Sequence, residues 1–131
     1  MASHDEVVRL TSPGSPPLDA LLVEVNTGAT DTFKYDLFVV PKGSAASGTP
    51  TATLVGATRN AQAYGANLRW QGPAHLRVEY LQARSVQGGG TTEVGGQAVQ
   101  VELVSGVTDP SAPSGGMDYN LRKPPSSAPP R

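Results

Sequence analysis

Four acidic residues are the candidates for acid–base chemistry in this sequence: Asp31, Asp36, Glu79 and Glu102. Hydrolysis of a glycosidic bond requires two carboxyl groups that flank the same bond, so two of these residues would have to share a cleft. Asp36, Glu79 and Glu102 alternate with apolar residues, which is typical of charges on the solvent side of a half-buried sheet. A carboxylate-dependent hydrolase is therefore the least favoured function, and we expect a protein that is not an enzyme.

Metal and cofactor sites find no support in the residue types. The chain has no cysteine and two histidines. His4 lies near the N-terminus and His75 beside a predicted turn, so their spacing does not resemble that of a zinc site. We expect no metal ion and no cofactor.

Two glycine-containing segments could be mistaken for phosphate-binding loops. Residues 26–33, "NTGATDTF", contain one glycine and lead into a strand, whereas a phosphate loop needs several glycines and a following helix. Residues 88–90 and 95–96 are glycine but also precede a predicted strand. We predict a turn at the first segment and a flexible inter-strand loop at the second.

A hairpin is the clearest local structure in the sequence. In "NLRWQGPAHLRVEY", residues 67–80, apolar and polar residues alternate on both sides of a turn at 71–74. If Trp70 faces Leu76, the solvent side of the hairpin is also defined. This register brings two arginines together.

In that register Arg69 lies directly opposite Arg77, and like charges in that position repel each other. The favoured explanation is that a local carboxylate, Glu79 or Asp36, offsets the repulsion. The alternative is that the two guanidinium groups hold an anion or an acidic partner. The candidate ligand-binding residues are accordingly Arg69, Arg77 and Glu79.

The charge distribution argues against nucleic acids and membranes as partners. Ten Lys and Arg balance eleven Asp and Glu, for a net charge of -1, and neither sign forms a block. Nucleic-acid binders usually carry a clustered basic surface, and a membrane span needs about 20 apolar residues in succession. We expect no nucleic-acid binding and no membrane insertion by this segment.

The remaining pattern predicts a single all-β domain at residues 18–107, an antiparallel β-sandwich or curved meander sheet of about six strands. A flexible leader is expected at residues 1–17, with a short edge strand as an option at 6–10. Residues 108–131, rich in Pro, Gly and Ser, are expected to be a largely disordered tail. The predicted core consists of Leu21, Val23, Val25, Phe33, Tyr35, Leu37, Val39, Leu68, Trp70, Leu76, Val78, Tyr80, Val99, Val101 and Leu103.

Three segments together resemble small bacterial exported or lipoprotein-like β-rich proteins of unknown function: "GATDTFKYDLFVVPKG", "NLRWQGPAHLRVEYLQAR" and "QAVQVELVSGV". The resemblance implies a periplasmic or envelope-associated protein. The sequence departs from such proteins because it has neither a signal segment nor a lipidated cysteine, so a cytoplasmic location is the alternative. No site residue is carried over from this resemblance.

The leading functional hypothesis is a non-enzymatic binding or accessory domain of the bacterial envelope that recognises a protein or an anionic ligand. The alternative is a structural, self-assembling subunit that uses strand edges and tails, so an oligomer is an open expectation.

Overall fold

A computed structural model describes residues 3–26, 34–58, 64–110, 112 and 116–117. Over these residues the chain forms nine strands and no helix, so no described helix could cross a membrane. The strands are β1 (Ser3–Thr11), β2 (Leu18–Asn26), β3 (Lys34–Pro41), β4 (Ala52–Val55), β5 (Ala66–Gly72), β6 (His75–Tyr80), β7 (Ser85–Gly88), β8 (Gly90–Val94) and β9 (Gln97–Val104).

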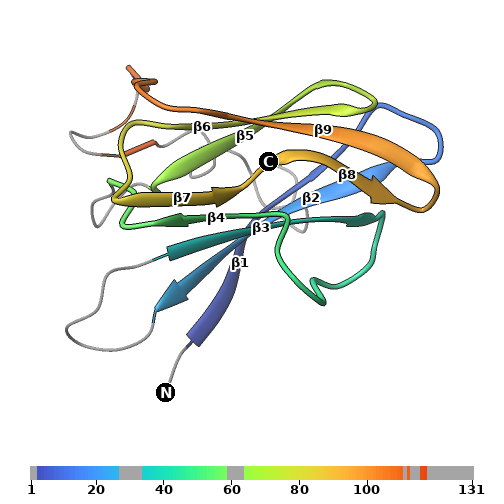
Figure 1. The fold of residues 1–131 in the computed structure, drawn as a ribbon, viewed down its shortest axis with the longest axis horizontal. Helices are drawn as coiled ribbons and strands as arrows, with labels where there is room; N and C mark the ends of the chain where they lie inside the picture. Colours follow the sequence, from blue (N-terminus) through green and yellow to red (C-terminus); the bar gives the residue numbers. More distant parts are fainter. Residues whose placement is uncertain (1–2, 27–33, 59–63, 111, 113–115, 118–131) are drawn as a thin grey trace, which may run out of the picture.

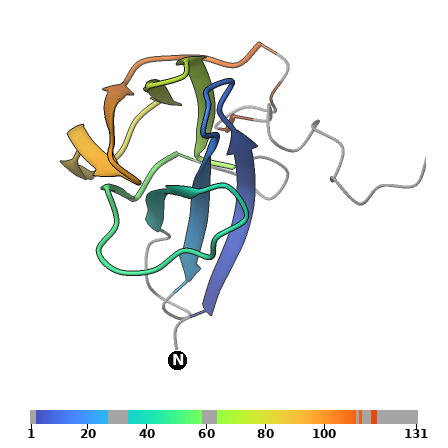
Figure 2. The ribbon, with the colours of Figure 1, turned by 90° about the vertical axis from the view of Figure 1, so that its right-hand side faces the viewer.

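The strands form two sheets that pack face to face (Figures 1 and 2). The first sheet has the order β1-β2-β3-β4-β7, and the second has the order β5-β6-β9-β8. The predicted all-β sandwich is confirmed, although with nine described strands instead of about six.

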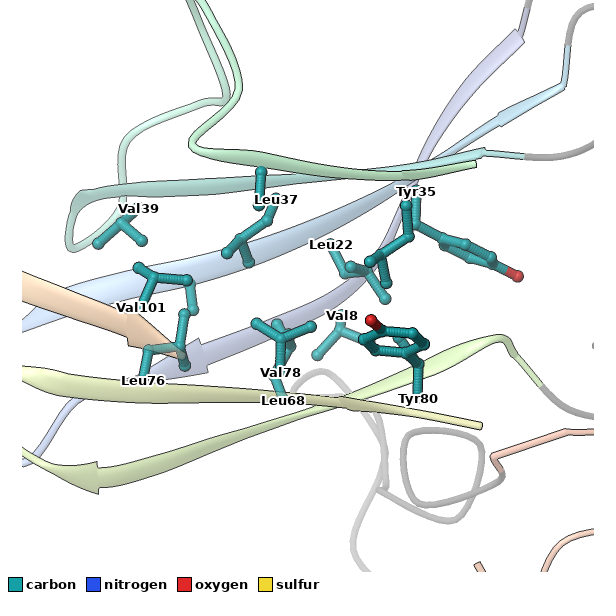
Figure 3. Close-up of a cluster of buried hydrophobic side chains, with 14 of the residues drawn as sticks. Val8, Leu22, Tyr35, Leu37, Val39, Leu68, Leu76, Val78, Tyr80 and Val101 are labelled. Atoms are coloured by element: carbon teal, nitrogen blue, oxygen red, sulfur yellow. The ribbon is translucent and has the colours of Figure 1, made fainter. Parts of the chain in front are cut away.

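The core lies between the sheets, where apolar side chains alternate with polar ones along each strand. Figure 3 shows Leu22, Tyr35 and Leu37 of the first sheet facing Leu76 and Val78 of the second. These five side chains are almost fully buried. The faces of β3 and of the hairpin that were predicted to be buried therefore do point toward the core.

The inward face of β2 differs from the prediction. Leu18, Ala20 and Leu22 belong to the core between the sheets, whereas Leu21 and Val23 lie on the outer face and are buried there. Because β2 is apolar on both faces, its alternation could not fix which face turns inward. Phe33, another predicted core residue, lies outside the described residues.

The N-terminal boundary also needs correction. The segment expected to be a flexible leader contributes β1, which pairs antiparallel with β2 on both sides of an irregularity at Val7. The optional edge strand was therefore the better description, because β1 is the outer strand of its sheet. Val8 from this strand is buried in the core, which gives the segment an apolar anchor.

The glycine-rich segment, predicted to be a flexible loop, contains β7 and β8. Gly88, Gly89 and Gly90 have φ angles of 85°, 90° and 86°. Residues with a Cβ atom rarely adopt such positive φ angles. These glycines form the corner at which the chain leaves the first sheet and enters the second.

The second sheet is mixed, with one parallel strand pair beside antiparallel ones. β6 and β9 are parallel, because between them the chain leaves the second sheet to form β7 and returns to it as β8. Beyond β9, Met117 is buried and bridges Tyr64. The domain thus extends past residue 107, and residues 118–131 lie outside the described part.

Candidate binding sites on the outer faces

The hairpin of β5 and β6 has the predicted register. Trp70 pairs with Leu76, and Arg69 lies directly opposite Arg77. Since Leu68 and Leu76 point into the core, the two arginines project from the outer face of the second sheet. Their side chains are 44% and 35% exposed.

Glu79 lies between the two arginines and contacts both. Arg69 Nε donates to Oε1 of Glu79 at 2.8 Å, and Arg77 Nε lies 2.9 Å from Oε2. The second contact is an ion pair whose N–H is not aligned for a hydrogen bond. The Glu79 side chain is 9% exposed, so the structure brings all three sequence-predicted site residues into one cluster, the Arg69–Glu79–Arg77 triad.

Neighbouring polar groups extend this outer face. Glu102 of β9 pairs with Arg77 in register, and its Oε1 lies 3.0 Å from His75 Nε2. On the other side Asn67 donates from Nδ2 to Asp109 at 3.4 Å. Asn67 is buried, and its Oδ1 has no hydrogen-bond partner among the described residues.

A second charged cluster lies on the outer face of the first sheet. Asp19 accepts hydrogen bonds from the Gly43 backbone N–H at 3.0 Å, Thr11 Oγ1 at 2.6 Å and Arg9 Nη1 at 2.7 Å. Burial of Asp19 opposes its ionisation, but these three donors together hold its pKa below the ordinary value. The hydrogen bond of Arg9 with Glu6, and to a smaller extent that with Asp19, raises the pKa of the Arg9 guanidinium group. The contact with Gly43 fixes the beginning of the connection between β3 and β4.

That connection lies alongside the first sheet as a wide loop, drawn in green in Figures 1 and 2. Between it and the sheet is a half-open cavity of about 380 Å³. Its lining comes from β1, β2, β3 and the connection, and consists of His4, Val23, Asp36, Phe38, Ala46, Ser47, Gly48 and Pro50. Sequence reasoning missed this cavity because its walls are joined only by tertiary packing. The one available signal was Asp36, a charged residue beside Phe38 on the same face of a largely apolar strand.

The three candidate carboxylates that the structure describes lie on two opposite faces of the sandwich. Asp36 lies on the outer face of the first sheet, and Glu79 and Glu102 lie on the outer face of the second. Asp31 lies outside the described residues. Within the described ranges, no three His, Asp or Glu residues are placed to hold a metal ion.

Comparisons with family models, with curated proteins and with solved structures found no match to this chain.

Proposed function

We propose that this protein is a non-enzymatic binding domain that recognises a protein partner through the outer face of β5, β6 and β9. In this proposal Arg69 and Arg77 contact an acidic group of the partner. The observation that carries the proposal is the contact of both Nε atoms with the single, buried carboxylate of Glu79.

Glu79 restricts the two arginine side chains before any partner arrives. A free arginine loses about 2 kcal/mol of rotamer entropy when it is fixed in one geometry, and an anchored one loses less. Binding to a preorganised pair therefore costs less than binding to two mobile side chains. The anchoring carboxylate is itself shielded from solvent, whereas both arginine side chains are partly exposed.

The charges of the triad favour an acidic contact. In the triad two guanidinium groups contact one carboxylate. Glu102, another acidic group on this face, is placed against His75. A carboxylate from a partner can approach the exposed guanidinium groups in the paired geometry that arginine favours.

A non-enzymatic role is supported by the state of the carboxylates. Both oxygens of Glu79 contact arginines, and Asp36 lies on the opposite side of the sandwich. An acid pair for hydrolysis would need a shared cleft between carboxyl groups. Placement of the protein in the bacterial envelope is part of the proposal and rests on the sequence resemblance alone.

Affinity capture from envelope and cytosolic extracts of the source cell tests the proposal. The variant is Arg69→Ser with Arg77→Ser, and the matched control is Lys42→Ser with Arg84→Ser, which removes two exposed positive charges elsewhere. All three proteins are first checked for equal thermal unfolding. We expect one partner to be retained by the wild type and the control and lost by the variant. Equal retention by all three would place the binding site elsewhere.

A second candidate function is self-assembly through a strand edge. β7 is the last strand of the first sheet among the described residues, and it carries Val86, an exposed large apolar side chain. An unpaired edge can add a strand from another copy. Light scattering over a range of protein concentrations tests this function. Self-assembly would raise the average mass as the protein concentration rises, and Val86→Lys should abolish this rise.

A further inference from the structure

The cavity between the first sheet and the β3–β4 connection is chemically distinct from the arginine face. Its floor carries Val23, Asp36 and Phe38, and one wall is the segment from Ala46 to Pro50. At about 380 Å³ it falls within the range of roughly 300 to 1,000 Å³ found for small-molecule sites. Its location is on the other side of the sandwich from Arg69 and Arg77.

Asp36 is the unusual group in this cavity. It is 7% exposed, and its Oδ1 accepts a hydrogen bond from Thr53 Oγ1 at 2.8 Å. A buried carboxylate is ordinarily paired with a cation or several donors, because its desolvation is costly. Here a single hydroxyl is the hydrogen-bond donor among the described residues.

Three positively ionisable groups lie near this carboxylate along the chain or around the cavity, and none pairs with it. Lys34 is two residues away on the same face of β3, His4 lines the cavity, and Lys42 begins the connection. No ion pair joins any of them to Asp36 in the described part of the chain. Among the described residues, no cationic side chain therefore lies within ion-pair distance of Asp36.

Phe38 and the connection supply the rest of a cation site. A cation gains from lying over the face of an aromatic ring, and more so when it is shielded from water. Val23 and Pro50 offer apolar surface for the carbon atoms next to the charge. The hydrogen bond from Gly43 to Asp19 holds the beginning of the connection against the sheet, so this wall of the cavity is anchored.

We propose that this cavity binds an organic ammonium group with a short apolar body, paired with Asp36 and lying against Phe38. The ammonium can come from a small primary amine or from a lysine side chain of a peptide. The site is separate from the arginine face, so either proposal can fail without the other.

Calorimetric titration with butylammonium tests the site, and butanol serves as the neutral probe of matched shape. We expect Asp36→Asn to weaken butylammonium binding by about tenfold or more, because it keeps the shape of the side chain and removes its charge. Glu93→Gln removes one exposed carboxylate from the other sheet and should change the affinity by less than about twofold. Phe38→Leu should weaken butylammonium more than butanol.

NMR shift mapping on the wild-type protein provides a test that needs no variant. Butylammonium should shift the amide signals of Asp36, Phe38 and Gly48 at concentrations at which butanol does not. A lysine-containing peptide that binds more tightly than butylammonium would identify a peptide as the source of the ammonium, and the reverse order would identify a small amine. The proposal is overturned if neither ligand shifts these signals, if butanol binds equally well, or if folded Asp36→Asn binds like the wild type.

Discussion

Arg69 and Arg77 lie directly opposite each other across β5 and β6, and their Nε atoms are 2.8 and 2.9 Å from the two oxygens of Glu79. The repulsion expected from the sequence is therefore offset inside the protein. The same contact fixes the two guanidinium groups on an exposed face. Local neutralisation and preorganisation for a partner are thus two consequences of one buried carboxylate.

Replacing that carboxylate should destabilise the fold. We expect Glu79→Gln to lower the free energy of unfolding by about 1 to 2 kcal/mol, since the variant loses two ionic contacts and leaves the arginines to repel each other. Urea unfolding measures the change. The double variant Glu79→Gln with Arg69→Ser should be more stable than Glu79→Gln alone. If its loss of stability equals the sum of the losses of the two single variants, the two residues are not coupled.

The Asp19 cluster should make stability depend on pH. Its donors depress the pKa of Asp19 in the folded state, so the unfolded state binds a proton more readily and the stabilisation is present above about pH 4. This contribution is lost as the pH falls through the folded-state pKa. The stability difference between wild type and Asp19→Asn should therefore shrink below about pH 4. A difference that stays constant through acid unfolding would contradict the assigned hydrogen bonds; Glu93→Gln, an exposed carboxylate, is the control.

Trp70 connects the two sheets by a hydrogen bond. Its indole Nε1 donates to the carbonyl oxygen of Leu10 at 2.9 Å, and its ring packs partly buried against the core. Trp70→Phe should cost about 1 kcal/mol for the lost hydrogen bond, and Trp70→Ala about 2 to 4 kcal/mol for the lost packing as well. Thermal unfolding measures both changes. A Trp70→Phe melting temperature equal to that of the wild type would argue against the hydrogen bond, and equal melting temperatures for the two variants would argue against the packing.

Gly88 and Gly43 allow the cost of a positive φ angle to be measured separately from the cost of a steric clash. Both have a φ angle of 85°, but a Cβ on Gly88 would lie 2.3 Å from the carbonyl oxygen of Thr51, whereas a Cβ on Gly43 would meet nothing within 4 Å. Gly43→Ala should cost about 1 kcal/mol from φ strain alone. Gly88→Ala should cost at least about 2 kcal/mol, because backbone atoms of β4 must move. Similar melting temperatures would contradict the close approach of β7 to β4.

The elements predicted well from sequence are those with a local determinant. Alternation on both sides of a short turn fixed the register of β5 and β6, and with it the positions of Arg69, Arg77 and Glu79. Alternation alone also placed Tyr35 and Leu37 of β3 in the core. In each case one face is clearly more apolar than the other.

The elements that escaped prediction depend on distant neighbours. β7 and β8 are short and rich in glycine and polar residues, so they form strands only because β4 and β9 offer ladders to pair with. β1 carries adjacent acidic residues, Asp5 and Glu6, and lies next to a proline-rich turn, so its place in the sheet is decided by its pairing with β2. The cavity joins Asp36 to Gly48, residues whose proximity follows from the path of the β3–β4 connection and from no local pattern.

Photo-crosslinking in the source cell tests the proposed binding face most directly. A photoreactive residue is placed at Gln100, exposed on the outer face beside His75, or at Gln87 on the β7 edge. The account predicts a crosslink from position 100 to a different protein, lost when Arg69→Ser and Arg77→Ser are added, and little product from position 87. The account would be contradicted if position 100 gave no crosslink and position 87 gave a crosslink to a second copy of the chain.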